Sequence, residues 1–139
     1  MTEQPRKIDL LKTIEPKSDQ LNYDDMLAGP IRAKIVGLKA GTPDQPVLIV
    51  LEGQDRPYKP CKGMRRVLIA LWGDKGKDWI GKEIELVGNP AVKWGGVEVG
   101  GIQVSRMSGI DGPQTLKLTA SKGKRADYTV LPITEGQTK

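Results

Sequence analysis

One segment of the chain is similar to a loop that binds phosphates. Residues 76–82 (GKDWIGK) match the start of a phosphate-binding loop, in which glycine amides and a lysine hold a nucleotide. Such a loop needs Ser or Thr after the lysine, and Glu83 stands there. It also needs a strand before it and a helix after it, whereas the pattern here favours the reverse order. We therefore expect Trp79 and Ile80 to plug one end of the core and Gly81 to turn the chain into a strand.

A pair of acidic residues offers a different chemistry. Pro43-Asp44 followed by Glu52-Gly53-Gln54 is similar to metal-dependent nucleases, in which two carboxylates hold Mg²⁺ and a lysine assists the attacking water. Gln54 replaces that lysine, and Asp44 lies in a PDQP turn, where Asp commonly bonds its own backbone. A divalent-metal nuclease is therefore only a second alternative.

Other enzyme classes lack their usual residues. The chain of 139 residues has no histidine, which excludes Ser-His-Asp and Cys-His catalysis and the usual zinc site of His and Cys ligands. Its single cysteine, Cys61, excludes an internal disulfide. We predict a protein that is not an enzyme, with no catalytic residue, no metal site and no cofactor.

The charge of the chain indicates an anionic partner. The formal net charge is +5, and residues 1–29 contribute four basic against six acidic residues, so the rest of the chain is the basic part. A basic body of this kind favours binding of a polyanion. The alternative is that the charge only keeps a small protein in solution.

Basic residues gather at three places, each with an aromatic residue among them. Residues 56–66 (RPYKPCKGMRR) contain no acidic residue, and the other two places are VKWGG and TASKGKRADYTV. Cations would follow a phosphate backbone while rings stack on bases, which gives sequence-tolerant binding of a single strand. The alternative for each is a solvated surface or, for the ring at position 94, a plug of the core. The candidate nucleic-acid-binding residues are Arg56, Tyr58, Lys59, Lys62, Arg65, Arg66, Lys93, Trp94, Lys122, Lys124, Arg125 and Tyr128.

The elements that must position these residues are short. We expect a flexible N-terminal arm over residues 1–25, a folded domain over 26–131 and a flexible C-terminal tail over 132–139. Alternating or aliphatic runs predict strands at residues 31–38, 46–51 and 82–88, one or two more within 97–107, and another around 116–118. The first two strands would form a hairpin.

One helix is predicted in the body of the chain. Met64, Val67, Leu68 and Leu71 fall at helical spacing and form one apolar stripe, and Gly73 follows as a C-terminal cap. The element order predicts a mainly β protein with one helix, arranged as a small OB-like barrel. An open α+β sheet is the alternative.

The segments that carry a family resemblance cover residues 26–129. LAGPIRAKI, PCKGMRRVLIALWG, WIGKEIEL, VKWGGVEVGGIQVSRMS and LTASKGKRADYTV resemble a group of small phage and prophage proteins. Some of its members are OB-fold, single-stranded-DNA-binding proteins of phage replication or recombination. The pattern marks positions that are mostly architectural: Trp79, Gly81, Gly95, Gly96, Gly101 and Ile102. The ending LPITEGQTK departs from the acidic tail by which bacterial single-strand-binding proteins recruit partners.

The resemblance and the basic clusters together predict a phage-type single-stranded DNA-binding protein. Its expected partners are single-stranded DNA and phage or host replication and recombination proteins, and a homo-oligomer is left open. No run of 18 apolar residues and no signal peptide can be read, so we expect a cytoplasmic protein with no membrane partner. The first alternative is a phage protein that modulates a host factor and binds no nucleic acid.

Overall fold

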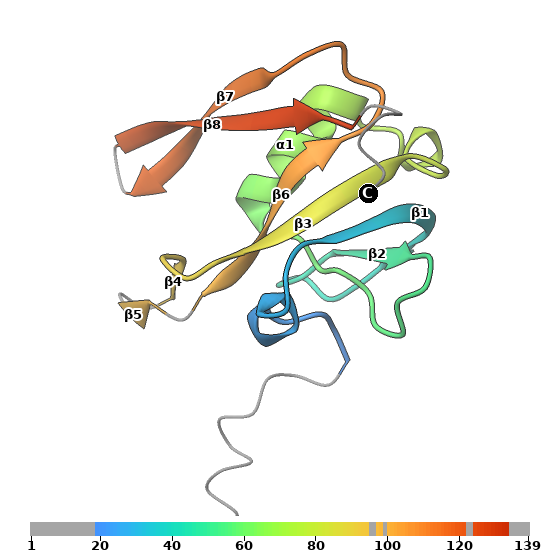
Figure 1. Cartoon of the computed structure of the whole chain (residues 1–139), viewed down its shortest axis with the longest axis horizontal. Coiled ribbons are helices and arrows are strands. Elements are labelled where there is room, and N and C mark those ends of the chain that lie inside the picture. The colour runs from blue at the N-terminus through green and yellow to red at the C-terminus, as the bar shows by residue number, and fades with distance from the viewer. Residues whose placement is uncertain (1–18, 95–96, 99, 122–123, 134–139) are drawn as a thin grey trace, which may run out of the picture.

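A computed structural model describes residues 19–94, 97–98, 100–121 and 124–133 of the chain (Figure 1). The elements in these residues are, in chain order, η2 (Tyr23–Met26), β1 (Ile31–Ala40), β2 (Val47–Leu51), α1 (Lys62–Trp72), η3 (Gly76–Asp78), β3 (Glu83–Asn89), β4 (Lys93–Trp94), β5 (Val97–Glu98), β6 (Gly101–Met107), β7 (Gln114–Ser121) and β8 (Lys124–Pro132). The strands expected from the sequence are confirmed, and β4 and β8 are additional.

The main sheet has six strands in the order β2-β1-β3-β6-β8-β7. All neighbours are antiparallel except β6 and β8, which are parallel and pair at only two positions. A separate two-stranded ribbon consists of β4 and β5. The structure confirms a mainly β protein with one helix.

The sheet does not close into a barrel, so its architecture is the alternative that we considered, an open α+β sheet. Closure would require the outer strands β2 and β7 to pair with each other, and in the described residues they do not. Instead, Tyr58 forms an antiparallel bridge with Ile49 of β2. A short segment that follows β2 therefore occupies part of its outer edge.

Helix α1 covers one face of the sheet (Figure 1). Met64, Val67, Leu68 and Trp72 are its buried residues, which confirms the predicted stripe with Trp72 in addition. Gly73 ends the helix with a φ of 90°, a value that favours glycine. The sheet contributes residues to this core that alternate with less buried positions along β2 and β3. These core residues are Ile35, Ile49, Leu51, Ile84, Leu86, Val104, Met107 and Val130.

The segment 76–82 closes one end of this core. Trp79 is buried, its indole N–H donates to the carbonyl oxygen of Gly73 at 3.0 Å, and its ring lies 6.1 Å from that of Trp72. Gly81 has a φ of 90° and leads into β3. The predicted plug is thus confirmed for Trp79 but is wrong for Ile80, which follows η3 and is 45 % exposed.

The residues before β1 pack onto the body, so a flexible arm reaching to residue 25 is wrong for residues 19–25. Leu21 is buried, and its backbone N–H donates to the carbonyl oxygen of Pro57 at 2.9 Å. The ring of Tyr23 lies so close to Gly88 and Gly100 that a Cβ at Gly100 would be 2.7 Å from it. Burial of these side chains fixes the segment. The predicted tail is likewise wrong for residues 132–133, since Pro132 belongs to β8 and the backbone N–H of Ile133 donates to the carbonyl oxygen of Met107 at 3.0 Å. The rest of the predicted arm and residues 134–139 of the predicted tail lie outside the described residues.

None of the helices in the described part of the chain is long and apolar enough to cross a membrane.

Candidate nucleic-acid interface

Two cations of the basic run 56–66 are paired with the segment before β1. The Nη2 atom of Arg56 lies 2.6 Å from Oδ1 of Asp25, and Nη1 donates to the carbonyl oxygen of Gln20 at 3.2 Å. Nζ of Lys59 lies 3.3 Å from Oδ2 of Asp19. Arg56 therefore holds the N-terminal segment against the body and is already neutralised.

The carboxylate of Asp25 is the centre of this attachment. Burial acts to raise the pKa of Asp25, but a hydrogen bond from the backbone N–H of Asn22 and the charge and hydrogen bond of Arg56 outweigh it. The pKa of Asp25 is therefore lowered. A carboxyl group whose pKa is lower in the folded state stabilises that state above its unfolded pKa, and this contribution is lost as the pH falls through the folded pKa.

We expect Asp25→Asn to lower the free energy of unfolding by about 1 kcal/mol at pH 7, because the pair is only partly exposed. The difference from the wild type should shrink as the pH falls below about 4 and vanish only below the lowered pKa of the folded state, where the wild-type carboxyl group is also protonated. Urea denaturation at pH 7 and at low pH measures both values. Asp24→Asn is the matched control, since Asp24 is exposed in the same helical turn. Equal losses in the two variants would contradict this role of Asp25.

The remaining cations of the run lie at the start of α1. Lys62 and Arg66 are exposed, and Nη1 of Arg65 makes a long contact of 3.5 Å with the carbonyl oxygen of Pro60. In the described residues, no carboxylate forms an ion pair with Lys62, Arg65 or Arg66. These three side chains are therefore the cations of the run that can meet an external anion without first losing a carboxylate partner.

A pocket of about 620 Å³ opens between this part of α1 and the β1–β2 loop. We call it the basic pocket, and its lining is Asp44, Gln45, Lys59, Pro60, Cys61, Lys62 and Arg65. Three cations face one carboxylate in this lining. The contribution of Asp44 and Gln45 is not predicted from the sequence, because nothing local tells which element a hairpin loop will meet.

Tyr58 is a core residue, so its prediction as a stacking residue is wrong. Its side chain is 2 % exposed, and its hydroxyl donates to the carbonyl oxygen of Ile102 at 3.4 Å. Burial, with a smaller effect of Cys61 and Tyr128, raises the pKa of this phenol well above its ordinary value. The backbone bridge to Ile49 turns the ring inward, where no base can reach it.

The second aromatic candidate, Tyr128 of β8, is half-buried and also bonded internally. Its hydroxyl donates to the carbonyl oxygen of Val104, and burial, followed by the effect of Cys61, raises its pKa to about 12. Tyr128 and Leu116 are opposite one another on the face of the hairpin that packs on the core. Tyr128 thus supports the hairpin and is not presented for stacking.

The basic residues of this hairpin lie apart from the basic pocket. Arg125 is exposed and pairs with Thr119, one position along from Leu118, whose side chain lies beside Gly63 of α1. Because side chains alternate along a strand, Arg125 lies on the hairpin face that is turned away from α1. Lys122 and the side chain of Lys124 lie outside the described residues.

The third cluster is on the β4–β5 ribbon, which leaves the main sheet at another place than the β7–β8 hairpin (Figure 1). Lys93 is exposed there, and the side chain of Trp94 lies outside the described residues. The three clusters of the sequence are therefore carried by three separate elements. Of these, the start of α1 gathers its cations around a pocket.

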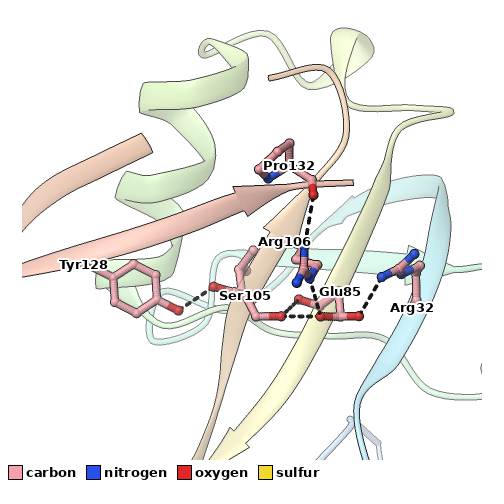
Figure 2. A network of polar contacts seen from close by, with 7 residues as sticks. Arg32, Glu85, Ser105, Arg106, Tyr128 and Pro132 are labelled. Atoms are coloured by element: carbon pink, nitrogen blue, oxygen red, sulfur yellow. Dashed lines mark hydrogen bonds and ion pairs between the residues drawn. The ribbon is translucent and has the colours of Figure 1, made fainter. Parts of the chain in front are cut away.

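Two further arginines belong to a network on the sheet face opposite α1 (Figure 2). Glu85 of β3 lies between them: its Oε1 is 3.0 Å from Nη2 of Arg32, and its Oε2 is 3.4 Å from Nε of Arg106. The hydroxyl of Ser105 donates to Oε2 at 2.8 Å, and Nη1 of Arg106 donates to the carbonyl oxygen of Pro132 at 3.3 Å. This network ties four strands together.

Asp44 and Glu52, the residues of the nuclease alternative, are separated by the length of β2. Asp44 precedes this five-residue strand and Glu52 follows it. A strand of this length spans about 16 Å, so the two carboxylates cannot share one metal ion. In the described residues, no group of three or more His, Cys, Asp or Glu side chains is arranged to hold one. Asp44 and Glu52 therefore cannot form the metal site that the nuclease alternative requires.

Comparison of the chain with protein-family models, with curated proteins and with solved structures found no match.

Proposed function

We propose that the protein binds single-stranded DNA, with the cations at the start of α1 as its principal phosphate contacts. The observation that supports this most directly is the basic pocket, where Lys59, Lys62 and Arg65 converge. Lys62 and Arg65 form no ion pair with a described carboxylate. Unneutralised cations at one concave place favour a polyanion, because each phosphate contact releases condensed counterions.

A single strand fits this site better than a duplex. A volume of about 620 Å³ lies in the range of pockets that enclose small ligands, so it suits part of a flexible strand. Contacts to phosphates carry no sequence information, so we propose sequence-tolerant binding. A role in phage replication or recombination, with proteins of those processes as partners, belongs to the same proposal and stands on the family resemblance.

Replacement of Arg65 and Arg66 by Glu tests the proposal. We expect the affinity for a labelled poly-dT strand of about 30 nucleotides to fall by at least about tenfold, because two phosphate contacts become repulsive. The slope of log affinity against log salt should decrease by about 2. Fluorescence anisotropy over a salt series, with the duplex of the same length in parallel, measures both quantities.

The matched control is Lys75→Glu with Lys77→Glu. These lysines are exposed and lie at η3, beyond the C-terminal end of α1, so the control changes the net charge by the same amount away from the start of α1. We expect it to retain most of the affinity. An equal loss in both double variants would mean that only the overall charge matters. Absence of salt-sensitive binding by the wild type would overturn the proposal and favour the alternative of a phage protein that acts on a host factor.

A further inference from the structure

We propose that the basic pocket holds a terminal phosphate of the DNA strand, a phosphomonoester. This inference rests on the proposed function, since it assigns one end of the bound strand to one place on the protein. The pocket, not the basic run as a whole, supports it, because a pocket distinguishes the end of a strand from its middle.

The wall formed by the β1–β2 loop is a tight turn. The backbone N–H of Gly41 donates to the carbonyl oxygen of Pro46 at 2.9 Å, and that of Gln45 donates to the carbonyl oxygen of Thr42 at 3.1 Å. A Cβ at Gly41 would lie 2.1 Å from the carbonyl oxygen of Gln45, so the turn closes only with glycine there. Asp44 and Gln45 are therefore held in place before any ligand arrives.

The charge of the lining matches a dianion. Lys59, Lys62 and Arg65 face one carboxylate, that of Asp44, so the lining has an excess of two positive charges once a ligand takes the place of Asp19 beside Lys59. A phosphomonoester carries between about 1.5 and 2 negative charges at pH 7, whereas an internal phosphodiester carries one. Lys59 is paired with Asp19, and its own side chain is only 11 % exposed, whereas the Asp19 carboxylate is 68 % exposed. A phosphate that enters the pocket would therefore have to take the place of Asp19 beside Lys59, and the exposure of Asp19 means that this exchange costs little.

The shape of the site also favours a strand end. An internal phosphate brings a nucleotide on each side, and both would have to pass between the β1–β2 loop and α1. A terminal phosphate brings only one. Gln45 and Asp44 lie on the loop wall. The side-chain amide of Gln45 can then donate hydrogen bonds to that nucleotide and accept them from it, and the carboxylate of Asp44 can accept them.

Three oligo-dT strands of about 12 nucleotides test the inference in the wild type: one with a 5′-phosphate, one with a 3′-phosphate and one with hydroxyls at both ends. We expect one of the phosphorylated strands to bind about fivefold tighter than the unphosphorylated strand at the same salt concentration, because it adds charge-assisted hydrogen bonds. Which of the two it is tells which end the pocket receives.

Cys61 reports occupancy of the pocket directly. It is the only cysteine of the chain, it is exposed and it lines the pocket. At strand concentrations that saturate binding, the preferred phosphorylated strand should slow alkylation of Cys61 by iodoacetamide more than the unphosphorylated strand does. Mass spectrometry of the intact protein follows this rate and needs no variant that could fail to fold.

Two variants locate the effect. Lys62→Ala with Arg65→Ala should abolish the preference for a phosphorylated end. Arg66→Ala, one residue outside the lining, should weaken all three strands alike. Equal affinities for the three strands, with equal protection of Cys61, would overturn the inference and leave the proposed function standing.

Absence of binding by any of the three strands would instead overturn the proposed function. Alkylation of Cys61 in the presence of thymidine monophosphates or of thymidine would then test separately whether the pocket binds a phosphomonoester. Slower alkylation of Cys61 in the presence of the 5′- or 3′-monophosphate, but not of thymidine, would support a phosphomonoester site. Equal alkylation rates with the monophosphates and with thymidine would overturn the phosphomonoester site as well.

Discussion

Tyr58→Ala is expected to lower the free energy of unfolding by about 3–5 kcal/mol, the range for truncating a buried aromatic side chain to alanine. The ring is enclosed in the core and its hydroxyl reaches the carbonyl oxygen of Ile102. A loss of this size is a large part of the stability of a domain, which is about 5–15 kcal/mol. Urea denaturation followed by circular dichroism measures it.

Tyr58→Phe separates packing from hydrogen bonding. It keeps the ring and removes only the long bond to Ile102, so its cost should stay within about 1 kcal/mol. Its affinity for poly-dT should equal that of the wild type. A Tyr58→Ala variant with wild-type stability and weakened DNA binding would show that the ring leaves the core to stack on a base.

Glu85→Ala is expected to destabilise the protein by about 2 kcal/mol, which is between the values for surface and fully buried ion pairs. Glu85 is 15 % exposed on the central strand β3, and the two arginines directly opposite it on β1 and β6 would lose their common carboxylate. Their like charges would then face each other across β3. Urea denaturation at low and at high salt measures the effect.

Asp127→Ala is the matched control for Glu85→Ala. Asp127 also forms a cross-strand ion pair, with Lys117 directly opposite it, but both side chains are largely exposed. Its removal should cost less than about 0.5 kcal/mol. Similar losses of stability in the two variants would mean that the position of Glu85 between two arginines makes no extra contribution to the free energy of unfolding.

The helix and most strands could be predicted because their signals are local. The stripe of Met64, Val67 and Leu68 has helical spacing, and strands such as Glu83–Asn89 alternate between core and solvent. Strand β8 could have been predicted in the same way, since Ala126, Tyr128 and Val130 follow a period of two. The basic residues just before this run suggest a charged surface segment, and they obscure the alternating pattern that indicates a strand.

The candidate site was harder to predict because pairing between distant residues decides it. Pro57, Lys59 and Pro60 beside Tyr58 are typical of an exposed loop, yet the bridge to Ile49 draws the ring into the core. Likewise, nothing in the basic run tells that Asp25 neutralises Arg56. Charge clustering correctly singles out the start of α1, but it does not tell which cations are already paired.

Pairing between distant residues also decides whether the sheet stays open or closes into a barrel. The order of two strands, a helix and further strands suits both a barrel and an open sheet. Which of them forms depends on the partner of each outer strand, and residues such as Tyr58 at the edge of β2 decide this.

The pattern of strand pairing also has a consequence for the order in which the protein folds. The hairpins β1–β2 and β7–β8 and the pair β3–β6 join segments that are near in sequence, and such units form in microseconds. Two seams join them: Ile31 with Leu86, across the whole of α1, and the two-residue parallel contact of β6 with β8. Closing the long loop between Ile31 and Leu86 costs entropy before any contact is gained, so the pairing of β1 with β3 sets the folding rate. The Glu85 network spans both the β1–β3 and the β6–β8 contacts, so it forms late, after the hairpins that it joins.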